Sequence, residues 1–144
     1  KWSKQTVSDN DENLFLKALF NELPQFVEHS LTLHISLPKD QRLTKIIEYL
    51  HHHYRDEIKM EDLSDAALLS FRTLERIFKK ETGLTLSKYQ QMLRIIKSLE
   101  FLSAGHLTIS ETAYEVGYRS VQAYTRSFLS VMQFRPTDFV KTIQ

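Results

Sequence analysis

The sequence contains no cysteine and only three glycines and three prolines in 144 residues. The lack of cysteine excludes disulfide frameworks and thiolate metal sites, and it agrees with a cytoplasmic location, which we predict. The scarcity of glycine and proline disfavours a turn-rich β architecture and favours helices joined by short connections. No stretch approaches the roughly 20 apolar residues that a membrane-spanning helix needs, and no signal peptide is visible. We therefore predict an all-α fold with no membrane partner.

The sequence also lacks the motifs on which an enzyme depends. No glycine-rich phosphate loop, nucleophile elbow or paired-carboxylate pattern occurs. The most obvious candidates for metal ligands are three consecutive histidines, His51 to His53. Side chains at consecutive helical positions point about 100° apart, so the three cannot converge on one ion, and no Asp, Glu or Cys partner stands at a usable helical spacing with a clear second shell. We interpret this run as a partly exposed helix end, and we predict no catalytic activity, no metal and no other cofactor.

The formal net charge is only +1, but the basic residues are concentrated in one part of the chain. Residues 1–40 hold 4 basic and 6 acidic side chains, whereas residues 70–98 hold 7 basic and 2 acidic ones, a local net charge of +5. Basic charge gathered on one segment is typical of a protein whose partner is a polyanion. Nucleic acid is therefore the first partner to consider.

The stretch SFRTLERIFKKETG, residues 70–83, opens this basic segment with the pattern of an amphipathic helix. Ser70 is a good N-cap, and Gly83 suits the left-handed residue that follows a helix. Helical spacing predicts an apolar face that packs against a core and a polar face opposite it. The apolar face comprises Phe71, Leu74, Ile77 and Phe78, and the polar face comprises Arg72, Glu75, Arg76 and Lys79.

The same plan occurs a second time in SVQAYTRSFLSVMQ, residues 120–133, which lies 50 residues further along the chain. Arg126 corresponds to Arg76, and the serine that opens the first stretch has its counterpart in Ser120. The chain therefore carries its key element twice.

Further helices are predicted around these two stretches. Short amphipathic helices over residues 60–68 and 108–117 precede them, which makes two helix-turn-helix units, at about residues 60–83 and 108–133. Thr108 and Glu111 form the pattern of a capping box. A long helix over about residues 85–103 joins the two units rigidly, a helix over residues 41–54 precedes the first, and a last one begins at Pro136.

We place both helix-turn-helix units in one domain, residues 39–144, preceded by a short helix and strand-like linker segment over residues 1–38. The linker contains a helical pattern at residues 12–23 and an alternating, strand-like pattern at residues 31–37. Residues 1–38 are either a linker or remnant of an N-terminal dimerisation or effector domain, or they contribute a helix that folds back on the main core. Because the sequence begins with Lys1 rather than Met, we expect a fragment of a longer protein.

Residues 42–140 resemble the DNA-binding domain of the AraC/XylS family of bacterial transcription regulators. The resemblance rests on the two helix-turn-helix units, the run FKKETG at residues 78–83, Arg94 in the linking helix, the ending RPTDF at residues 135–139 and the extra residue Arg119 in the second turn. It implies that the helix after each turn enters a major groove, in successive grooves on one face of duplex DNA. It also implies activation through RNA polymerase, and homodimerisation or effector sensing through the N-terminal segment or a missing N-terminal domain.

Carried over by position, the resemblance assigns two sets of DNA contacts. The base-reading set comprises Arg72, Glu75, Arg76, Gln122, Thr125 and Arg126, and the DNA-backbone set comprises Ser70, Thr73, Lys79, Lys80, Lys88 and Ser120. The chemistry suits base reading, because Arg binds guanine with two hydrogen bonds, Gln binds adenine in the same way, and Glu accepts from cytosine. Contacts to phosphates set affinity and register without reading sequence. The alternative for each residue is a solvated helix face, and for Glu75 a pair with Lys79 within the helix.

The second unit departs from the family pattern at several positions. Leu129 and Ser130 stand where the first unit has Lys79 and Lys80, Gln133 replaces the usual glycine, and Thr112 occupies a position that is normally apolar. In the second unit we therefore expect weaker contacts to the DNA backbone, because the lysines are missing. We also expect a frayed or rearranged end of the helix at Gln133 and slightly looser packing around Thr112. The first unit is predicted to anchor the protein on DNA, and the second to adjust to the site and to contribute discrimination more than affinity.

The predicted function is sequence-specific binding of double-stranded DNA by a bacterial activator of transcription. We expect an asymmetric site of two major-groove segments about 10 base pairs apart, with the linking helix setting the spacing. The alternative is a helical protein-interaction module without DNA binding. That alternative explains the apolar faces, but it does not explain why both serine-capped helices present an arginine at the same position.

Overall fold

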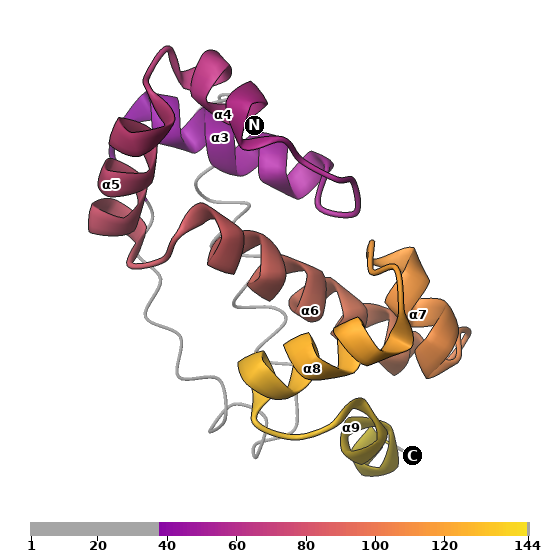
Figure 1. Ribbon diagram of the computed structural model, residues 1–144. Helices are drawn as coiled ribbons and strands as arrows, with labels where there is room; N and C mark the ends of the chain where they lie inside the picture. The colour runs from indigo at the N-terminus through magenta and orange to yellow at the C-terminus, as the bar shows by residue number, and fades with distance from the viewer. Residues whose placement is uncertain (1–37, 144) are drawn as a thin grey trace, which may run out of the picture. The chain divides into compact units, whose positions relative to one another are not determined.

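The computed structural model describes residues 38–143 (Figure 1). Within these residues the chain forms seven α-helices and no strand, as the sequence predicts. The helices are α3 (Gln41–His52), α4 (Met60–Ala67), α5 (Phe71–Thr82), α6 (Leu86–Ala104), α7 (Ile109–Glu115), α8 (Val121–Met132) and α9 (Pro136–Ile143). The helix predicted at residues 12–23 and the strand predicted at residues 31–37 lie outside the described residues. None of the helices in residues 38–143 is long and apolar enough to cross a bilayer.

The predicted helix ends are confirmed to within two residues, because the capping residues act locally. The hydroxyl of Ser70 accepts from the backbone N–H of Thr73, and that of Ser120 accepts from Ala123. Thr108 and Glu111 form both bonds of the predicted capping box. Each cap satisfies N–H groups that have no acceptor within their own helix.

The chain divides into two compact units. Of the described residues, unit 1 contains 38–53 and 58–89, which make up α3, α4, α5 and the first turn of α6. Unit 2 contains residues 54–57, the rest of α6, and α7, α8 and α9. In unit 1, α4 packs against α3 and α5; in unit 2, α8 packs against α7 and α9 (Figure 1). Each unit thus builds one helix-turn-helix pair on a core of its own.

The fourth, eighth and twelfth residues of α5 and of α8 are buried. They are Leu74, Phe78 and Thr82 in α5, and Tyr124, Phe128 and Met132 in α8. This spacing of four residues places the buried side chains on one stripe of each helix. The 50-residue repeat seen in the sequence is therefore confirmed as a repeat of burial.

One expectation for the apolar face of α5 is wrong. Phe71 was expected to face the core, yet its side chain is 40% exposed. The reason is that Phe71 is the first residue of the helix, at the end of the apolar stripe rather than within it. Ile77 is half-buried, at the edge of the same stripe.

The loosened packing expected at Thr112 is not seen. Thr112 is completely buried, and its hydroxyl donates to the carbonyl of Thr108 at 2.8 Å. A buried hydroxyl is tolerated when it has a partner, so this side chain fits its position in α7.

The end of α8 is neither frayed nor rearranged, contrary to expectation. Gln133 adopts the left-handed conformation with φ 69°, and its N–H donates to the carbonyl of Leu129. Gly83 ends α5 in the same way, with φ 88° and a bond to Lys79. The second unit therefore keeps the geometry of the first and bears the strain of a side chain at this position.

We predict that Gln133→Gly stabilises the protein by about 1 kcal/mol, because glycine adopts the left-handed conformation without strain. Gly83→Ala, at the matching position of unit 1, should destabilise it by a similar amount. Urea unfolding followed by circular dichroism measures both changes. A Gln133→Gly variant that is less stable than the parent would show that the glutamine side chain contributes more than the strain it causes.

Two glycines of unit 2 with positive φ differ in their surroundings. A Cβ added to Gly117, in the turn between α7 and α8, would lie 2.5 Å from the backbone oxygen of Arg55. A Cβ added to Gly105, which precedes α7, would meet nothing within 4 Å. Gly117 is therefore required by space as well as by its φ of 103°, whereas Gly105 is required by φ alone.

Gly117→Ala should destabilise the protein on the order of 3 kcal/mol, because the backbone near Arg55 has to move. Gly105→Ala should destabilise it by about 1 kcal/mol, through the strain of the left-handed conformation alone. Denaturant titration of the two variants side by side tests the close approach. Equal losses of stability would contradict it.

Candidate nucleic-acid interface

The turn between α4 and α5 sets where α5 begins. Leu68 ends α4 in the left-handed conformation, with φ 58°, and its side chain is 90% exposed. The N–H of Leu69 donates to the carbonyl of Ser64 at 3.1 Å, and Ser70 then caps α5. The N-terminal turn of α5 is therefore held at the surface by bonds within the helix-turn-helix pair itself.

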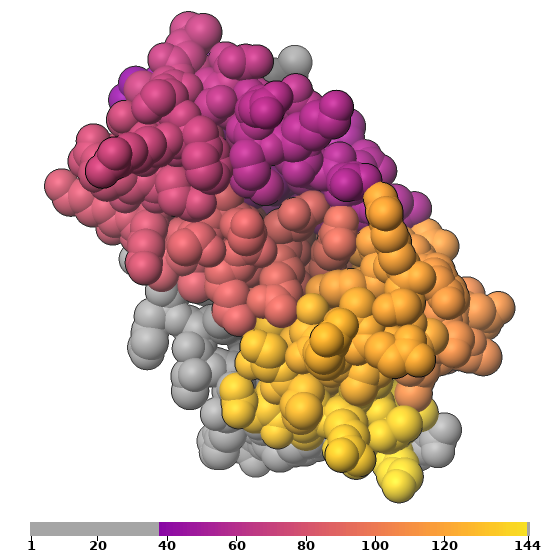
Figure 2. All heavy atoms as spheres, in the orientation of Figure 1, coloured from indigo at the N-terminus to yellow at the C-terminus, as the bar shows by residue number. Residues whose placement is uncertain are grey.

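The outward face of α5 is basic. Its four cationic side chains, Arg72, Arg76, Lys79 and Lys80, are all exposed. None of the ion pairs found among residues 38–143 involves any of them. Figure 2 shows α5 at the surface, at the rose-coloured left edge of the view. Unpaired cations on one helix face are available for phosphates and for base edges.

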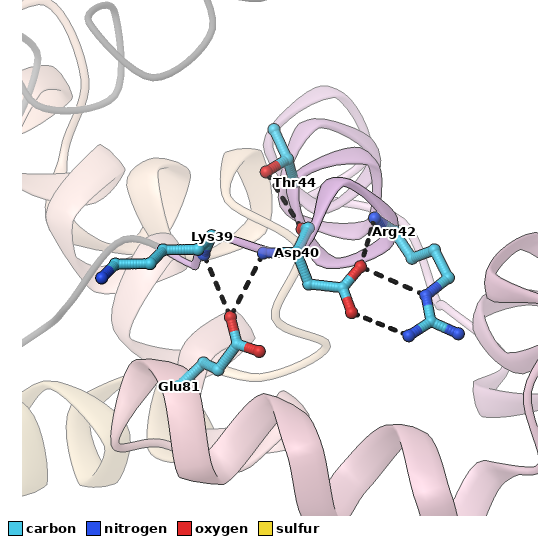
Figure 3. Close-up of polar contacts among 5 residues, drawn as sticks. All are labelled: Lys39, Asp40, Arg42, Thr44 and Glu81. Carbon is cyan, nitrogen blue, oxygen red and sulfur yellow. Dashed lines mark hydrogen bonds and ion pairs between the residues drawn. The ribbon is translucent and has the colours of Figure 1, made fainter.

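The two glutamates of α5 bind backbone N–H groups of neighbouring segments. Glu81 accepts from Lys39 at 3.0 Å and from Asp40 at 3.3 Å, just before α3 (Figure 3). Glu75 accepts from the N–H of Leu86, the first residue of α6, at 2.8 Å. Both carboxylates are thus engaged at the N-termini of other helices, where negative charge is favourable.

Asp40 completes the start of α3. Its carboxylate accepts from the backbone N–H of Arg42 at 2.9 Å and forms an ion pair with the guanidinium of the same residue at 2.8 Å (Figure 3). The Arg42 side chain holds the pKa of Asp40 below its usual value. Together with Glu81, this cap joins the beginning of α3 to the end of α5.

The residues expected to read bases in unit 1 are not placed alike. Arg72 and Arg76 are exposed, as a base-reading role requires. Glu75 is half-buried and bonds Leu86, instead of forming the alternative pair with Lys79. Base reading by Glu75 stays a prediction.

Of the residues expected to contact the DNA backbone, Lys79, Lys80 and Lys88 are exposed. Ser70 and Thr73 bond each other, with the Ser70 hydroxyl donating to that of Thr73 at 3.0 Å. These backbone contacts stay predictions too.

The corresponding face of α8 carries fewer charges. Gln122 and Arg126 are exposed, and Thr125 is half-buried. Leu129 and Ser130 are also exposed, with Leu129 at 44%. The face of α8 therefore presents one cation where that of α5 presents four.

Arg94 is a structural residue of unit 2. Its guanidinium donates to the carbonyls of Tyr54 at 2.6 Å and Asp56 at 2.9 Å, and it lies 5.4 Å from the ring centre of Tyr118. Burial lowers the pKa of Arg94. This half-buried cation fixes residues 54–57 to α6, a role that the sequence did not reveal.

Two ion pairs of unit 2 were also not predicted. Arg55 pairs with Glu115 at 2.9 Å, and Arg119, the extra residue of the second turn, pairs with Glu57 at 2.6 Å. The partners lie about 60 residues apart in sequence, so no local pattern could have indicated them. Both pairs are well exposed and contribute little to stability by themselves.

Two histidines of the run bind separate partners in the structure. His51 bonds the hydroxyl of Tyr89 at 3.0 Å, and His52 bonds the carbonyl of Glu48 at 2.8 Å. No group of three His, Asp or Glu side chains among residues 38–143 is arranged to hold a metal ion.

Comparison with known proteins agrees with this geometry. A family model described as a helix-turn-helix domain matches residues 63–142. The HTH-type transcriptional activator RhaS of Citrobacter koseri is 29% identical over 120 residues, which are 83% of this chain and 43% of the relative. RhaS of Salmonella arizonae is 28% identical over the same shares. The chain thus spans less than half the length of these relatives.

Solved structures show the same fold. The DNA-binding domain of AdpA, in complex with a target DNA, superposes with a TM-score of 0.65 at 22% identity, over 70% of this chain and 91% of that one. The C-terminal domain of AraT, a response regulator from Geobacillus stearothermophilus, gives 0.67 at 23% identity, over 72% and 86%. An AraC-type regulator from Chromobacterium violaceum gives 0.67 at 20% identity, over 72% and 92%.

The match of the family model covers more than half of the chain, and it includes α5, α6, α7, α8 and most of α9. Both helix-turn-helix pairs, their serine caps and the basic face of α5 agree with it. The chain belongs to the AraC-type helix-turn-helix family of DNA-binding transcription regulators.

Proposed function

We propose that the chain binds double-stranded DNA sequence-specifically as the DNA-binding part of a bacterial transcription regulator, with α5 and α8 as its two recognition helices. The observation that carries the proposal is the pair Arg76 and Arg126. Each is the sixth residue of its helix, and each is exposed opposite the buried stripe. Arginine in such a position can bind guanine through O6 and N7 in a major groove.

Base reading is assigned to Arg72 and Arg76 of α5 and to Gln122, Thr125 and Arg126 of α8. Lys79, Lys80 and Lys88 are assigned to phosphates, together with the cap residues Ser70, Thr73 and Ser120. The exposure of the arginines, of Gln122 and of the lysines supports these roles. Because α8 has one exposed cation on this face and α5 has four, we assign most of the affinity to unit 1 and discrimination among sites to unit 2.

The relatives are named transcriptional activators, and on that ground we extend the proposal to activation. Contact with RNA polymerase and homodimerisation through an N-terminal segment or domain belong to the same proposal. Both rest on the family alone. A cytoplasmic location follows from the same role.

Binding of a fluorescent mixed-sequence duplex at increasing salt tests DNA binding directly. Affinity should fall steeply as salt rises, because phosphate contacts release condensed counterions. The absence of any duplex binding at low salt would contradict the proposal and favour a protein-interaction module.

The double variant Lys79→Ala/Lys80→Ala should reduce the slope of log K against log salt by about 2, since each lost phosphate contact removes about 0.9. Leu129→Ala/Ser130→Ala, at the matching positions of α8, is the control and should leave the slope unchanged. Equal slopes for the two double variants would contradict the assignment of these lysines to phosphates.

Arg76→Ala should weaken binding to a preferred duplex by roughly 1 to 3 kcal/mol and relax the preference for one guanine. Arg126→Ala should relax the preference in the other half of the site, with a smaller loss of affinity. Anisotropy titrations with single-base variants of the duplex separate the two effects. A much larger loss of affinity for Arg126→Ala than for Arg76→Ala would show that unit 1 is not the anchor.

A further inference from the structure

The junction that follows each recognition helix differs between the two copies of the repeat. In the 50-residue register, Glu75 of α5 corresponds to Thr125 of α8, and Leu86 corresponds to Pro136. Leu86 and Pro136 are the first residues of α6 and α9. Both differences between the copies therefore concern one location, the start of the helix that follows the recognition helix.

The start of a helix needs acceptors for its first N–H groups. In unit 1, the N–H of Leu86 donates to the Glu75 carboxylate at 2.8 Å. In unit 2, Pro136 has no N–H, and its ring fixes a φ that suits the first helical position. The two copies thus meet the same requirement differently: a carboxylate accepts from Leu86 in unit 1, and unit 2 has no N–H at the matching position.

The other bonds at the start of α6 cannot replace Glu75. The hydroxyl of Thr85 accepts from Lys88 at 3.1 Å, and the carbonyl of Thr85 accepts from Tyr89 at 2.9 Å. Loss of the Glu75 carboxylate would leave the partly buried N–H of Leu86 without a protein acceptor. Such a loss is more costly than the loss of an exposed bond.

We propose that Glu75 is a positioning residue, which holds α5 against the start of α6, and that it does not read a base. This inference rests on the proposed function, in which α5 is a recognition helix. A glutamate that reads cytosine would have to share its carboxylate with Leu86 or release that bond, and it would approach a surface lined with phosphates of its own charge sign. The carboxylate already has a partner that favours its negative charge, the N-terminus of α6.

One consequence concerns the specificity of unit 1. One oxygen of the Glu75 carboxylate is bound to Leu86, and one oxygen of the Glu81 carboxylate is bound to Lys39 and Asp40, so both acids of α5 are tied to backbone N–H groups of neighbouring segments. The outer face then offers mainly the donors of its four exposed cations. Unit 1 should therefore select guanines through its arginines and carry no glutamate contact to cytosine.

Three variants of the 144-residue chain test the inference. Glu75→Gln keeps an acceptor oxygen within reach of Leu86, so affinity and base preference should stay close to those of the parent. Glu75→Ala removes the acceptor, so the dissociation constant should rise by about tenfold for every duplex, with an unchanged order of preference. Thr125→Ala, the matched control in unit 2, should lower the melting temperature less than Glu75→Ala.

The readouts separate positioning from base reading. Base preference is measured on single-base variants of one duplex recovered by selection from a random pool. Hydrogen exchange of the Leu86 amide, followed by NMR without DNA, should be slow in the parent and in Glu75→Gln and faster in Glu75→Ala. A changed preference at one base position in Glu75→Gln or Glu75→Ala would overturn the proposal. Unchanged exchange of Leu86 in Glu75→Ala would overturn it as well.

The double variant Glu75→Thr/Leu86→Pro gives unit 1 the pair found in unit 2. It should bind DNA more tightly than Glu75→Thr alone, because proline removes the N–H that needs an acceptor. If loss of the buried Leu86 side chain unfolds this variant, the exchange rates of Glu75→Gln and Glu75→Ala decide the question. A parent chain that binds no duplex would overturn the proposed function. The hydrogen bond between Leu86 and Glu75 would then be tested separately, by comparing the exchange rate of the Leu86 amide in the parent and in Glu75→Ala.

Discussion

The structure depends on one constraint, the burial of every fourth residue along each recognition helix. Leu74, Phe78 and Thr82 in α5 lie in the core of unit 1, and their counterparts in α8 lie in the core of unit 2. Once this stripe is buried, the opposite face of the helix has to point to solvent, with its arginine at a fixed position. The shape of the proposed DNA-binding surface is therefore a consequence of packing, whereas its chemistry depends on which side chains occupy the exposed positions.

The sequence was sufficient to predict the all-α fold, both helix-turn-helix pairs and nearly every helix end. It was sufficient because these features are local. A serine or threonine cap acts within three residues, and a buried stripe shows as a period of four. Gln133 marks the limit of this reasoning, because the left-handed helix end forms despite its side chain. Phe71 marks another, since a residue at the end of a stripe carries the pattern without the burial.

Features that join distant segments could not be predicted. Glu75 and Glu81 both look like surface acids of an amphipathic helix. Glu75 nevertheless binds the first N–H of α6, and Glu81 binds a backbone N–H just before α3. Arg94 binds carbonyls of residues 54–57, which lie about 40 residues earlier in the chain. Such contacts depend on tertiary structure, and no local pattern in the sequence indicates them. The candidate site was thus predicted in its exposed cations but not in its supporting bonds.

Sequencing of the duplexes that the chain retains from a random pool tests the DNA-reading role of α5 and α8 most directly. Two recognition helices with an exposed arginine at the same position should enrich two short segments about 10 base pairs apart, each with at least one guanine. Recovery of this two-part motif would support the proposal that α5 and α8 each read one segment of the site. Retention of duplexes without any enriched sequence, or enrichment of one segment only, would contradict it.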